Sequence, residues 1–326
     1  TGDFLQHRQN NLNPFSLTND WITHLIEDQA GNIWVATYLG GINKLTFRSR
    51  QFSSYTILPD QTPLPESTHV AAISEASVWI EDGVNLKRFR ESKTSKTWKL
   101  PPAPADGGQV YELIELGEEV AWVGTWGRGL AKVTNGSLSF YPSRRIGIDE
   151  NYIATMCTDP FGLLWICANE AGLRRFDTKT YKDTLYRPSI RNSINSSVLT
   201  SVHVARDGFV WIGTRGKGLN RLDPKTERFE YWRNDPRDSS AISGGIVNTL
   251  FEDRNGALWI GTGQGLNRLD SRENKFEHYL RSSGAISEYV VAIAQDAKGD
   301  LWIGYNDGGM SKLDVQTRRF STYTTK

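Results

Sequence analysis

Apolar and polar residues alternate in short runs along most of this chain, and the runs come in groups of four. In residues 246–252 the alternation is that of a half-buried strand. A short apolar run, 257–261, follows the turn at 253–256, which has Asp at its first and Gly at its last position. A third short strand, 266–270, follows a Gly-rich break at 263–265, and residues 275–279 set Phe and Tyr between polar side chains. The pattern predicts four short strands joined by hairpin turns, which form one antiparallel sheet.

This four-strand unit occurs seven times, and each copy carries a tryptophan on its second strand. The tryptophans are Trp34, Trp79, Trp122, Trp165, Trp211, Trp259 and Trp302, at spacings of 45, 43, 43, 46, 48 and 43 residues. A period of roughly 40 to 50 residues is typical of propellers and solenoids. Seven sheets arranged radially cover faces that a single sheet would expose. We therefore predict an all-β, seven-bladed β-propeller of four-stranded antiparallel blades, with residues 1–326 as one domain and the tryptophans packed between neighbouring blades.

Two features of the array leave alternatives open. The second unit has Glu-Ala-Ser at residues 75–77 where the turn glycine should stand, and the third replaces the turn with Gly-Glu-Glu at residues 117–119, so the boundaries of these two blades are the least well defined. Each of the seven units supplies one outermost, fourth strand, and residues 1–7 resemble one further strand of this kind. This segment either pairs into the last blade, which leaves a surplus strand near Phe320, or it belongs to a blade upstream. Because the chain starts in the middle of a repeat without a methionine, we expect it to be part of a longer array.

Composition excludes several kinds of partner and site. The net charge of +1 gives no general attraction to nucleic acid, and no apolar run approaches 18 residues, so contact with a membrane would need segments absent from this sequence. The histidines have no metal-ligand spacing, and Asp-x-x-Gly before a tryptophan is interpreted as turn chemistry. We predict no metal and no cofactor. Cys157 and Cys167 are predicted to be free, buried thiols, because the hairpin sets them too far apart in register.

Recognition is expected where the copies differ, since residues repeated in every unit serve the fold. The copies differ in the loop after the tryptophan strand and at the start of the innermost strand, which share one face of a propeller. The residues at these places are Trp21, Tyr38, Trp126, Arg128, Tyr152, Asn169, Arg215, Lys217, Gln264, Tyr289, Tyr305 and Asn306. Aromatic, amide and guanidinium groups around one mouth of the central channel predict a small-molecule site. The arginines favour an acidic sugar or another carboxylate.

Five units resemble the two-component regulator propeller repeat, whose pattern runs roughly I-x-x-I-x-E-D-x-x-G-x-I-W-I-G-T-x-x-G-G-L-x-R-L-D. Residues 22–45, 199–223, 247–270 and 290–314 match it closely, and 153–177 matches with Cys167 and Ala168 in place of Gly-Thr. The resemblance implies the periplasmic sensor part of a bacterial inner-membrane receptor, with a small-molecule or oligosaccharide ligand. It also implies a second propeller or a second receptor copy as a partner. It supplies no catalytic motif.

Three functions are compatible with these features of the sequence. The first is a non-catalytic, ligand-sensing propeller of a signal-transduction receptor. The second is a scaffold that docks another protein on a propeller face. The third is a propeller lyase or glycosidase, for which Glu170 and Asp307 are the only acid–base pair that the sequence suggests.

Overall fold

The structure is a computed structural model, and it describes most of the chain. The described residues are 5–6, 16–28, 31–38, 41–46, 51–55, 69–73, 77–81, 84–90, 93–102, 108–117, 119–141, 152–189, 192–321 and 323–324. Nearly all regular structure in them is β-strand, and their only helical segment is the 3-10 turn η1 (Arg281–Ser283). None of the helical structure described has the length or apolar character needed to cross a membrane.

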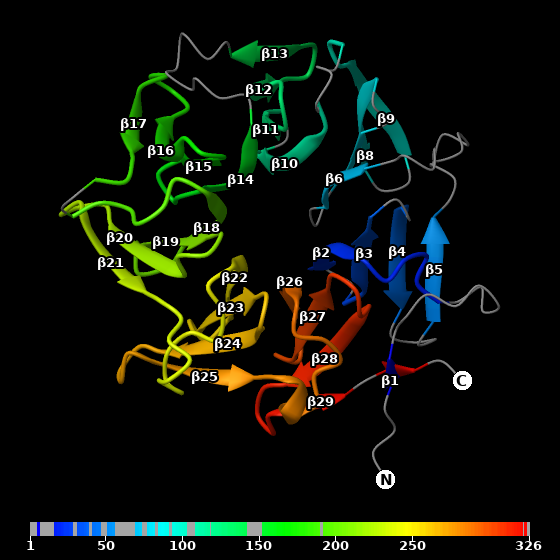
Figure 1. The fold of residues 1–326 in the computed structure, drawn as a ribbon. Coiled ribbons are helices and arrows are strands. Elements are labelled where there is room, and N and C mark those ends of the chain that lie inside the picture. The colour runs from blue at the N-terminus through cyan, green and yellow to red at the C-terminus, as the bar shows by residue number, and fades with distance from the viewer. Residues whose placement is uncertain are drawn as a thin grey trace. The chain divides into compact units, whose positions relative to one another are not determined.

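The strands form seven four-stranded antiparallel sheets, each built from four consecutive strands (Figure 1). The first three sheets consist of β2 (Ile22–Glu27), β3 (Ile33–Thr37), β4 (Gly41–Thr46) and β5 (Gln51–Tyr55); β6 (His69–Ile73), β7 (Val78–Glu81), β8 (Asn85–Arg90) and β9 (Lys93–Lys99); and β10 (Val110–Glu115), β11 (Ala121–Thr125), β12 (Leu130–Val133) and β13 (Leu138–Tyr141). The fourth and fifth consist of β14 (Ile153–Thr158), β15 (Leu163–Ala168), β16 (Gly172–Asp177) and β17 (Asp183–Tyr186); and β18 (Leu199–Val204), β19 (Val210–Thr214), β20 (Leu219–Asp223) and β21 (Arg228–Trp232). The sixth and seventh consist of β22 (Val247–Glu252), β23 (Leu258–Thr262), β24 (Gly265–Asp270) and β25 (Lys275–Tyr279); and β26 (Val290–Gln295), β27 (Leu301–Tyr305), β28 (Met310–Asp314) and β29 (Arg319–Ser321). The predicted fold class, a seven-bladed β-propeller, is confirmed, and each sheet is one blade.

The described residues belong to two compact units. Unit 1 comprises Thr1–Asp82, Lys87–Thr97 and Phe251–Lys326, and unit 2 comprises Gly83–Leu86 and Trp98–Leu250. The first and seventh blades lie in unit 1, and the third, fourth and fifth lie in unit 2. The prediction that residues 1–326 form one domain stays a prediction.

The turn aspartate of the repeat is bonded to the repeat tryptophan. In the sixth blade, one carboxylate oxygen of Asp253 accepts the indole N–H of Trp259 at 2.9 Å. The other oxygen accepts the backbone N–H groups of Asn255 and Ala257, both at 2.9 Å. The same indole bond is made by Asp28 at 2.9 Å, Asp159 at 3.4 Å and Asp296 at 3.2 Å. The aspartate therefore does more than form the turn, because it also ties the turn to a buried indole.

A basic residue on the third strand lies over the ring of each repeat tryptophan. It lies opposite the tryptophan in the strand register, as in the pairs Trp34–Lys44 and Trp302–Lys312. The distances from the charged group to the ring centroid are 4.8 Å for Lys44, 5.1 Å for Arg88, 5.5 Å for Lys132, 5.9 Å for Arg175, 5.3 Å for Arg221, 5.7 Å for Arg268 and 5.5 Å for Lys312. A cation at this distance from an aromatic face is attracted to it. Every blade therefore repeats the same indole–cation contact.

Within each unit, the tryptophan of one blade packs with the inner strands of the next. Trp165 shares a buried cluster with Leu199 and Val210 of the fifth blade, and Trp302 shares one with Ile22 and Ile33 of the first. These clusters support the interpretation of the tryptophans as packing residues between blades.

Close approach of neighbouring blades explains the glycine two residues after the tryptophan. A Cβ atom added at Gly304 would lie 2.6 Å from Cγ2 of Ile22 in the first blade. Overpacking of this kind strains a close-packed interior. Gly304 is therefore required by the contact between blades rather than by a turn.

The amino-terminal strand β1 (Leu5–Gln6) does not enter the last blade. It pairs in parallel with β30 (Tyr323–Thr324) in a separate two-stranded sheet, and Phe320 stays in β29, the fourth strand of that blade. Cys157 and Cys167 are both free, as predicted, but the prediction that both are buried holds for Cys167 alone. Cys167 is buried and Cys157 is half-buried.

Candidate functional site

The predicted site residues divide between the two units. Trp21, Tyr38, Gln264, Tyr289, Tyr305 and Asn306 belong to unit 1, and Trp126, Arg128, Tyr152, Asn169, Arg215 and Lys217 belong to unit 2. In both units they lie at the starts of innermost strands or in the loops after second strands, apart from Tyr305, which ends the second strand of its blade. That the twelve share one mouth of a central channel stays a prediction.

Three aromatic rings of unit 2 form a cluster at the start of the third and fourth blades. The ring of Trp126 lies 5.0 Å from that of Tyr152 and 5.2 Å from that of Tyr111, measured between centroids. The backbones of Trp126 and Tyr152 also meet in an isolated antiparallel bridge. Tyr111 is 41% exposed, so the cluster presents an aromatic surface to solvent.

Tyr111 escaped prediction from the sequence because a β-bulge turns it outward. The register of β10 against β11 shifts between Val110 and Glu112, which leaves Tyr111 as the extra residue. The same register shift recurs in the innermost strands of the first, fourth, fifth and seventh blades, so the bulge is a feature of the repeat, but the alternation of residue types does not reveal it. The position could have been noticed only as a tyrosine two residues after the predicted start of the strand.

Basic residues occupy the same loop position in two blades of unit 2. The backbone N–H of Arg128 bonds to Oγ1 of Thr125 at 3.0 Å, and its guanidinium donates to the carbonyl of Gly108. In the fifth blade, the backbone N–H of Lys217 bonds to Oγ1 of Thr214, also at 3.0 Å. The loop backbone is thus the same in both blades while its side chains change. Arg128 lies two residues after Trp126 and brings a half-buried cation into the same loop as the aromatic cluster.

The other polar residues of the set are held by their backbones. The N–H of Asn169 donates to the carbonyl of Tyr152 at 2.8 Å, and that of Arg215 donates to the carbonyl of Val198 at 3.1 Å. The side chains of Arg215 and Lys217 are exposed, and that of Asn169 is half-buried.

In unit 1, Trp21 and Tyr38 form a second aromatic group. Their rings stack with centroids 4.4 Å apart, and they are 43% and 40% exposed. The N–H of Tyr38 donates to the carbonyl of Trp21 at 2.9 Å, and the N–H of Asn306 donates in the same way to Tyr289 at 3.1 Å. The side chains of Tyr289 and Gln264 are exposed.

Tyr305 differs from the other predicted residues because it lies in the core. It is 1% exposed, and its hydroxyl is 2.8 Å from Oγ of Ser311. Burial raises its pKa well above the ordinary value. A ring in this position cannot line a surface that solvent reaches. In four of the other blades the position holds a threonine, such as Thr262, whose hydroxyl bonds to the hairpin backbone.

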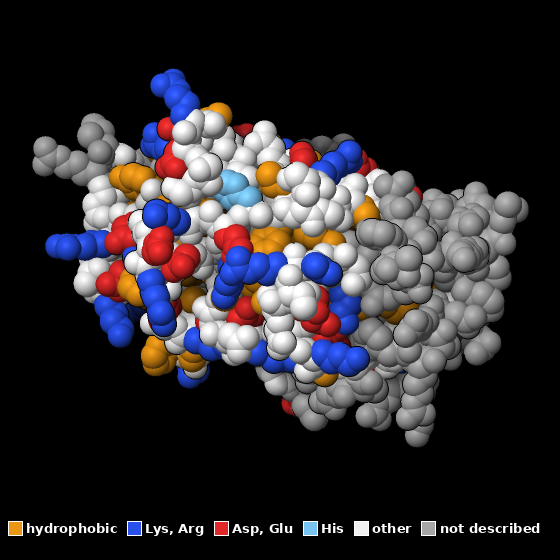
Figure 2. Space-filling view, turned by 90° about the horizontal axis from the view of Figure 1, so that it is seen from below, with side chains coloured by type: hydrophobic (Ala, Val, Ile, Leu, Met, Phe, Trp, Pro, Cys, Tyr) orange, Lys and Arg blue, Asp and Glu red, His pale blue; other side chains and the backbone are white. Residues whose placement is uncertain are grey.

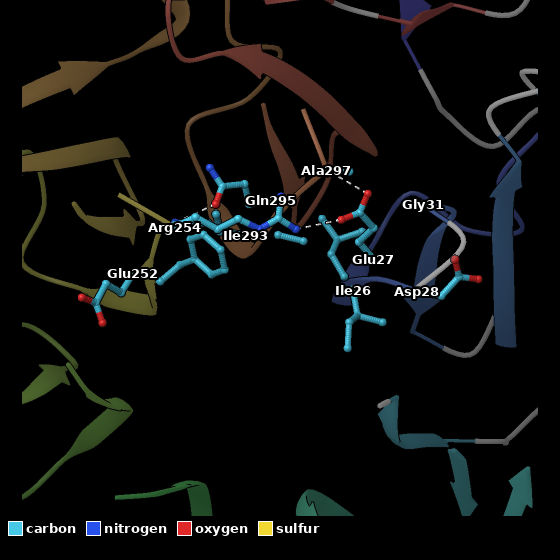
Figure 3. A pocket seen from close by; sticks show the side chains of 12 residues that line it. Ile26, Glu27, Asp28, Gly31, Glu252, Arg254, Ile293, Gln295 and Ala297 are labelled. Atoms are coloured by element: carbon cyan, nitrogen blue, oxygen red, sulfur yellow. Dashed lines mark hydrogen bonds and ion pairs between the residues drawn. The ribbon is translucent and has the colours of Figure 1, made fainter. Parts of the chain in front are cut away.

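A pocket of about 550 Å³ lies at the opposite ends of the innermost strands, within unit 1. It is lined by residues of the sixth, seventh and first blades (Figure 3). Six residues of extended strand separate Trp21 from Glu27 at the pocket, a distance of about 20 Å. The pocket is therefore distinct from the loops in which the sequence predicted a site, and the repeat pattern gave no signal for it.

Arg254 crosses the pocket and joins three blades. Its backbone N–H donates to Oε1 of Gln295 at 2.8 Å, and its guanidinium donates to the carbonyl of Asp296 at 2.7 Å and to Glu27 at 3.2 Å. The second oxygen of Glu27 accepts the N–H of Ala297 at 2.7 Å. Figure 3 shows the guanidinium pointing at Glu27.

A carboxyl group with an altered pKa lies one residue after Tyr111. Glu112 accepts a hydrogen bond from Oγ1 of Thr155 at 3.1 Å, between the innermost strands of the third and fourth blades. Burial, opposed by hydrogen bonds from Thr155 and from the backbone of Leu113 and Met156, raises its pKa to about 7. The group can therefore exchange protons near neutral pH.

Other chemistry is sparse among the residues that the structure describes. No three His, Cys, Asp or Glu side chains among them come together as a metal site. Glu170 and Asp307 belong to different units, and Asp307 accepts the hydroxyl of Ser287 at 2.8 Å. On the described part of the face in Figure 2, Lys and Arg side chains are interspersed with Asp and Glu.

Three segments of the chain match a family model, that of the two component regulator propeller. The matched residues are 16–39, 241–264 and 284–307, which correspond to the first, sixth and seventh blades. No curated protein matches the sequence.

Solved structures share the fold at low sequence identity. The extracellular domain of a protein described as a hybrid two component system from B. thetaiotaomicron is 17% identical with a TM-score of 0.71, and the match covers 96% of this chain and 39% of that one. A second such domain from B. thetaiotaomicron is 19% identical with a TM-score of 0.59, covering 96% and 47%. Virginiamycin B lyase from Staphylococcus aureus is 15% identical with a TM-score of 0.67, covering 91% and 96%. The chain thus spans less than half the length of the two extracellular domains. At these identities the likeness shows the fold alone.

Proposed function

Because this chain belongs to the two-component regulator propeller family, we propose that it is the extracytoplasmic, ligand-sensing part of a bacterial signalling receptor. Support comes from the matched repeats and from the likeness to two extracellular domains of hybrid two component systems. The proposed location is the periplasm, with the membrane reached through segments outside this sequence.

The proposed ligand is a carbohydrate-like or acidic small molecule, bound at the cluster of Tyr111, Trp126 and Tyr152. The observation that carries this proposal is the contact of three aromatic rings, one exposed and two half-buried, with the half-buried cation of Arg128 in the same loop as Trp126. Aromatic faces stack on apolar faces of sugar rings, and a guanidinium binds a carboxylate with two parallel hydrogen bonds. The stacked rings of Trp21 and Tyr38 provide a second exposed aromatic surface, in unit 1, for the same class of ligand.

Calorimetric titration with an oligogalacturonate and a neutral galactose oligomer tests the site. Trp126→Ala is expected to weaken binding by up to about tenfold, since loss of one stacked aromatic contact costs about 0.5 to 1.5 kcal/mol. Arg128→Gln should weaken only the acidic oligomer. Tyr231→Ala, which removes a tyrosine that is 48% exposed elsewhere in unit 2, serves as the matched control. Unaltered binding by Trp126→Ala would reject the site.

Binding without turnover is the second part of the proposal. The match to the two component regulator propeller model supports a sensor. A protein of the same fold from Staphylococcus aureus is, however, named as a lyase. Mass spectrometry of oligomers recovered after incubation should find them unchanged, and new fragments would contradict this part.

Signalling would require the ligand to favour one arrangement of two receptor copies over another, since only differential affinity shifts an equilibrium. Sedimentation of the chain with and without the bound oligomer measures such a shift. A stable dimer in the absence of ligand would instead favour the interaction scaffold.

A further inference from the structure

The pocket at the turn ends of the sixth, seventh and first blades has an apolar lining. Phe251, Leu25 and Ile293 come from the three neighbouring innermost strands. Phe251 and Leu25 are half-buried and Ile293 is 7% exposed. A pocket of about 550 Å³ falls within the range of sites for small organic molecules. The apolar part of a small organic molecule could pack against these three side chains.

Arg254 is the one cation among the described residues that line the pocket, beside the carboxylates of Glu27, Asp28 and Glu252. The side chain of Arg254 is 55% exposed, whereas that of Glu27, its ion-pair partner, is 9% exposed. Both oxygens of Glu27 accept hydrogen bonds from the protein. Figure 3 shows the side chains of Glu252 and Asp28 directed away from Arg254, and Asp28 is bonded within its own blade to Trp34.

Arg254 is also held in place before any ligand arrives. Its backbone N–H bonds to Gln295 and its guanidinium to the carbonyl of Asp296. An ion pair with one member so exposed is weak, so the guanidinium can be shared with a second carboxylate. A group positioned in advance loses little conformational freedom on binding.

We propose that this pocket binds a small amphiphilic carboxylate, an organic acid with an aromatic or branched apolar body. The carboxylate pairs with Arg254, and the apolar body packs against Phe251, Leu25 and Ile293. The site is separate from the aromatic cluster of unit 2, so its ligand would act alongside the one proposed above.

The probes are three compounds with one body and different charges: 4-phenylbutyrate, 4-phenylbutan-1-ol and 4-phenylbutylamine. Titration of the whole chain, followed by calorimetry and saturation-transfer NMR, gives their dissociation constants. The acid should bind saturably and about tenfold more tightly than the alcohol, as expected for one charge-assisted hydrogen-bonded pair. The amine should bind least.

Variants locate the site. Arg254→Gln should reduce the affinity for the acid to that of the alcohol, and Arg254→Lys, which keeps the charge, should retain part of the preference. Arg206→Gln is the matched control, because Arg206 follows the first turn residue of the fifth blade as Arg254 does in the sixth. Ala297→Trp places a large side chain at an exposed lining position and should abolish binding of all three probes.

Several results would overturn the proposal. These are no saturable binding of the acid, equal affinity for acid and alcohol, tightest binding of the amine, or equal effects of Arg254→Gln and Arg206→Gln. Should Arg254→Gln fail to fold in a thermal melt, Arg254→Lys and Ala297→Trp decide the question. Trp126→Ala should leave binding of the acid intact, which keeps this site distinct from the other.

Discussion

The pH dependence of stability should reveal the ionisation of Glu112. The carboxyl group has a pKa of about 7 in the fold against an ordinary value of 4.5. Because the folded pKa is the higher one, the folded state holds the proton more tightly than the unfolded state. The stability that the protonated group contributes is complete below pH 4.5 and is lost as the pH rises through the folded pKa.

The two pKa values set the size of the loss. A difference of 2.5 units, from 7 minus 4.5, corresponds to an upper limit of about 3.4 kcal/mol at about 1.4 kcal/mol per unit. Relative to low pH, the loss should be about 0.8 kcal/mol at pH 5, about 2 kcal/mol at pH 6 and about 3 kcal/mol at pH 7. Since Glu112 retains some exposure to solvent, we expect about 2 kcal/mol between pH 5 and pH 8.

Urea denaturation of the wild type and of Glu112→Gln, from pH 5 to pH 8, measures this loss. The amide keeps an oxygen for the hydroxyl of Thr155 and cannot ionise, so its stability relative to the wild type should rise by about 2 kcal/mol across the range. Glu230→Gln removes an exposed carboxylate of the same unit and should follow the wild type. Parallel curves for the wild type and Glu112→Gln would refute the reasoning.

Three further outcomes test the blade contacts and the thiols. Asp253→Ala should destabilise the chain by about 2 to 4 kcal/mol in urea denaturation, because it leaves a buried indole N–H and two backbone N–H groups without their acceptor; a loss below about 1 kcal/mol would contradict this. Gly304→Ala should cost about 1 to 3 kcal/mol, because its Cβ would press on Ile22, and an unchanged midpoint would show that the blades relax apart. Burial raises the pKa values of the Cys157 and Cys167 thiols, so a disulfide reagent at pH 8 should react slowly with the native chain and rapidly after denaturation.

The fold could be predicted from the sequence because the four-strand unit with its tryptophan occurs seven times. One unit, residues 246–279, has the strand pattern of many β-proteins, and its strands alone do not indicate how it packs. The even spacing of the tryptophans supplies that information, since a fixed period requires each sheet to meet its neighbours in the same way. Even the weak second unit, which keeps Trp79, forms its blade.

The candidate sites were less predictable because they depend on side-chain direction. Alignment by counting placed Tyr305 beside the loop residues, but strand alternation points its ring into the core. Tyr111 lies at a bulge, where the regular alternation of sides along the strand is interrupted. The pocket at Arg254 depends on contacts with Gln295 and Glu27 that are 41 and 227 residues away in the chain. The residue pattern around Arg254 in the sequence cannot indicate contacts with residues so distant in the chain.

The turn aspartate of the repeat nevertheless affects the blades that carry the two proposed binding sites. Where the repeat keeps its aspartate, as at Asp253, the turn is held by three hydrogen bonds to one carboxylate. The next residue, Arg254, is then free to vary without loss of the turn, and in the sixth blade it reaches across to Glu27.

In the third blade Leu116 replaces the aspartate, and the indole nitrogen of Trp122 has no hydrogen-bond partner among the described residues. An unsatisfied buried donor costs stability, so the third blade should be among the first to open, and it is the blade that carries Tyr111, Trp126 and Glu112. Two of the three rings proposed to bind ligand, Tyr111 and Trp126, therefore lie on a blade whose packing is less well satisfied than that of the sixth. Binding can more readily change the local structure of such a blade.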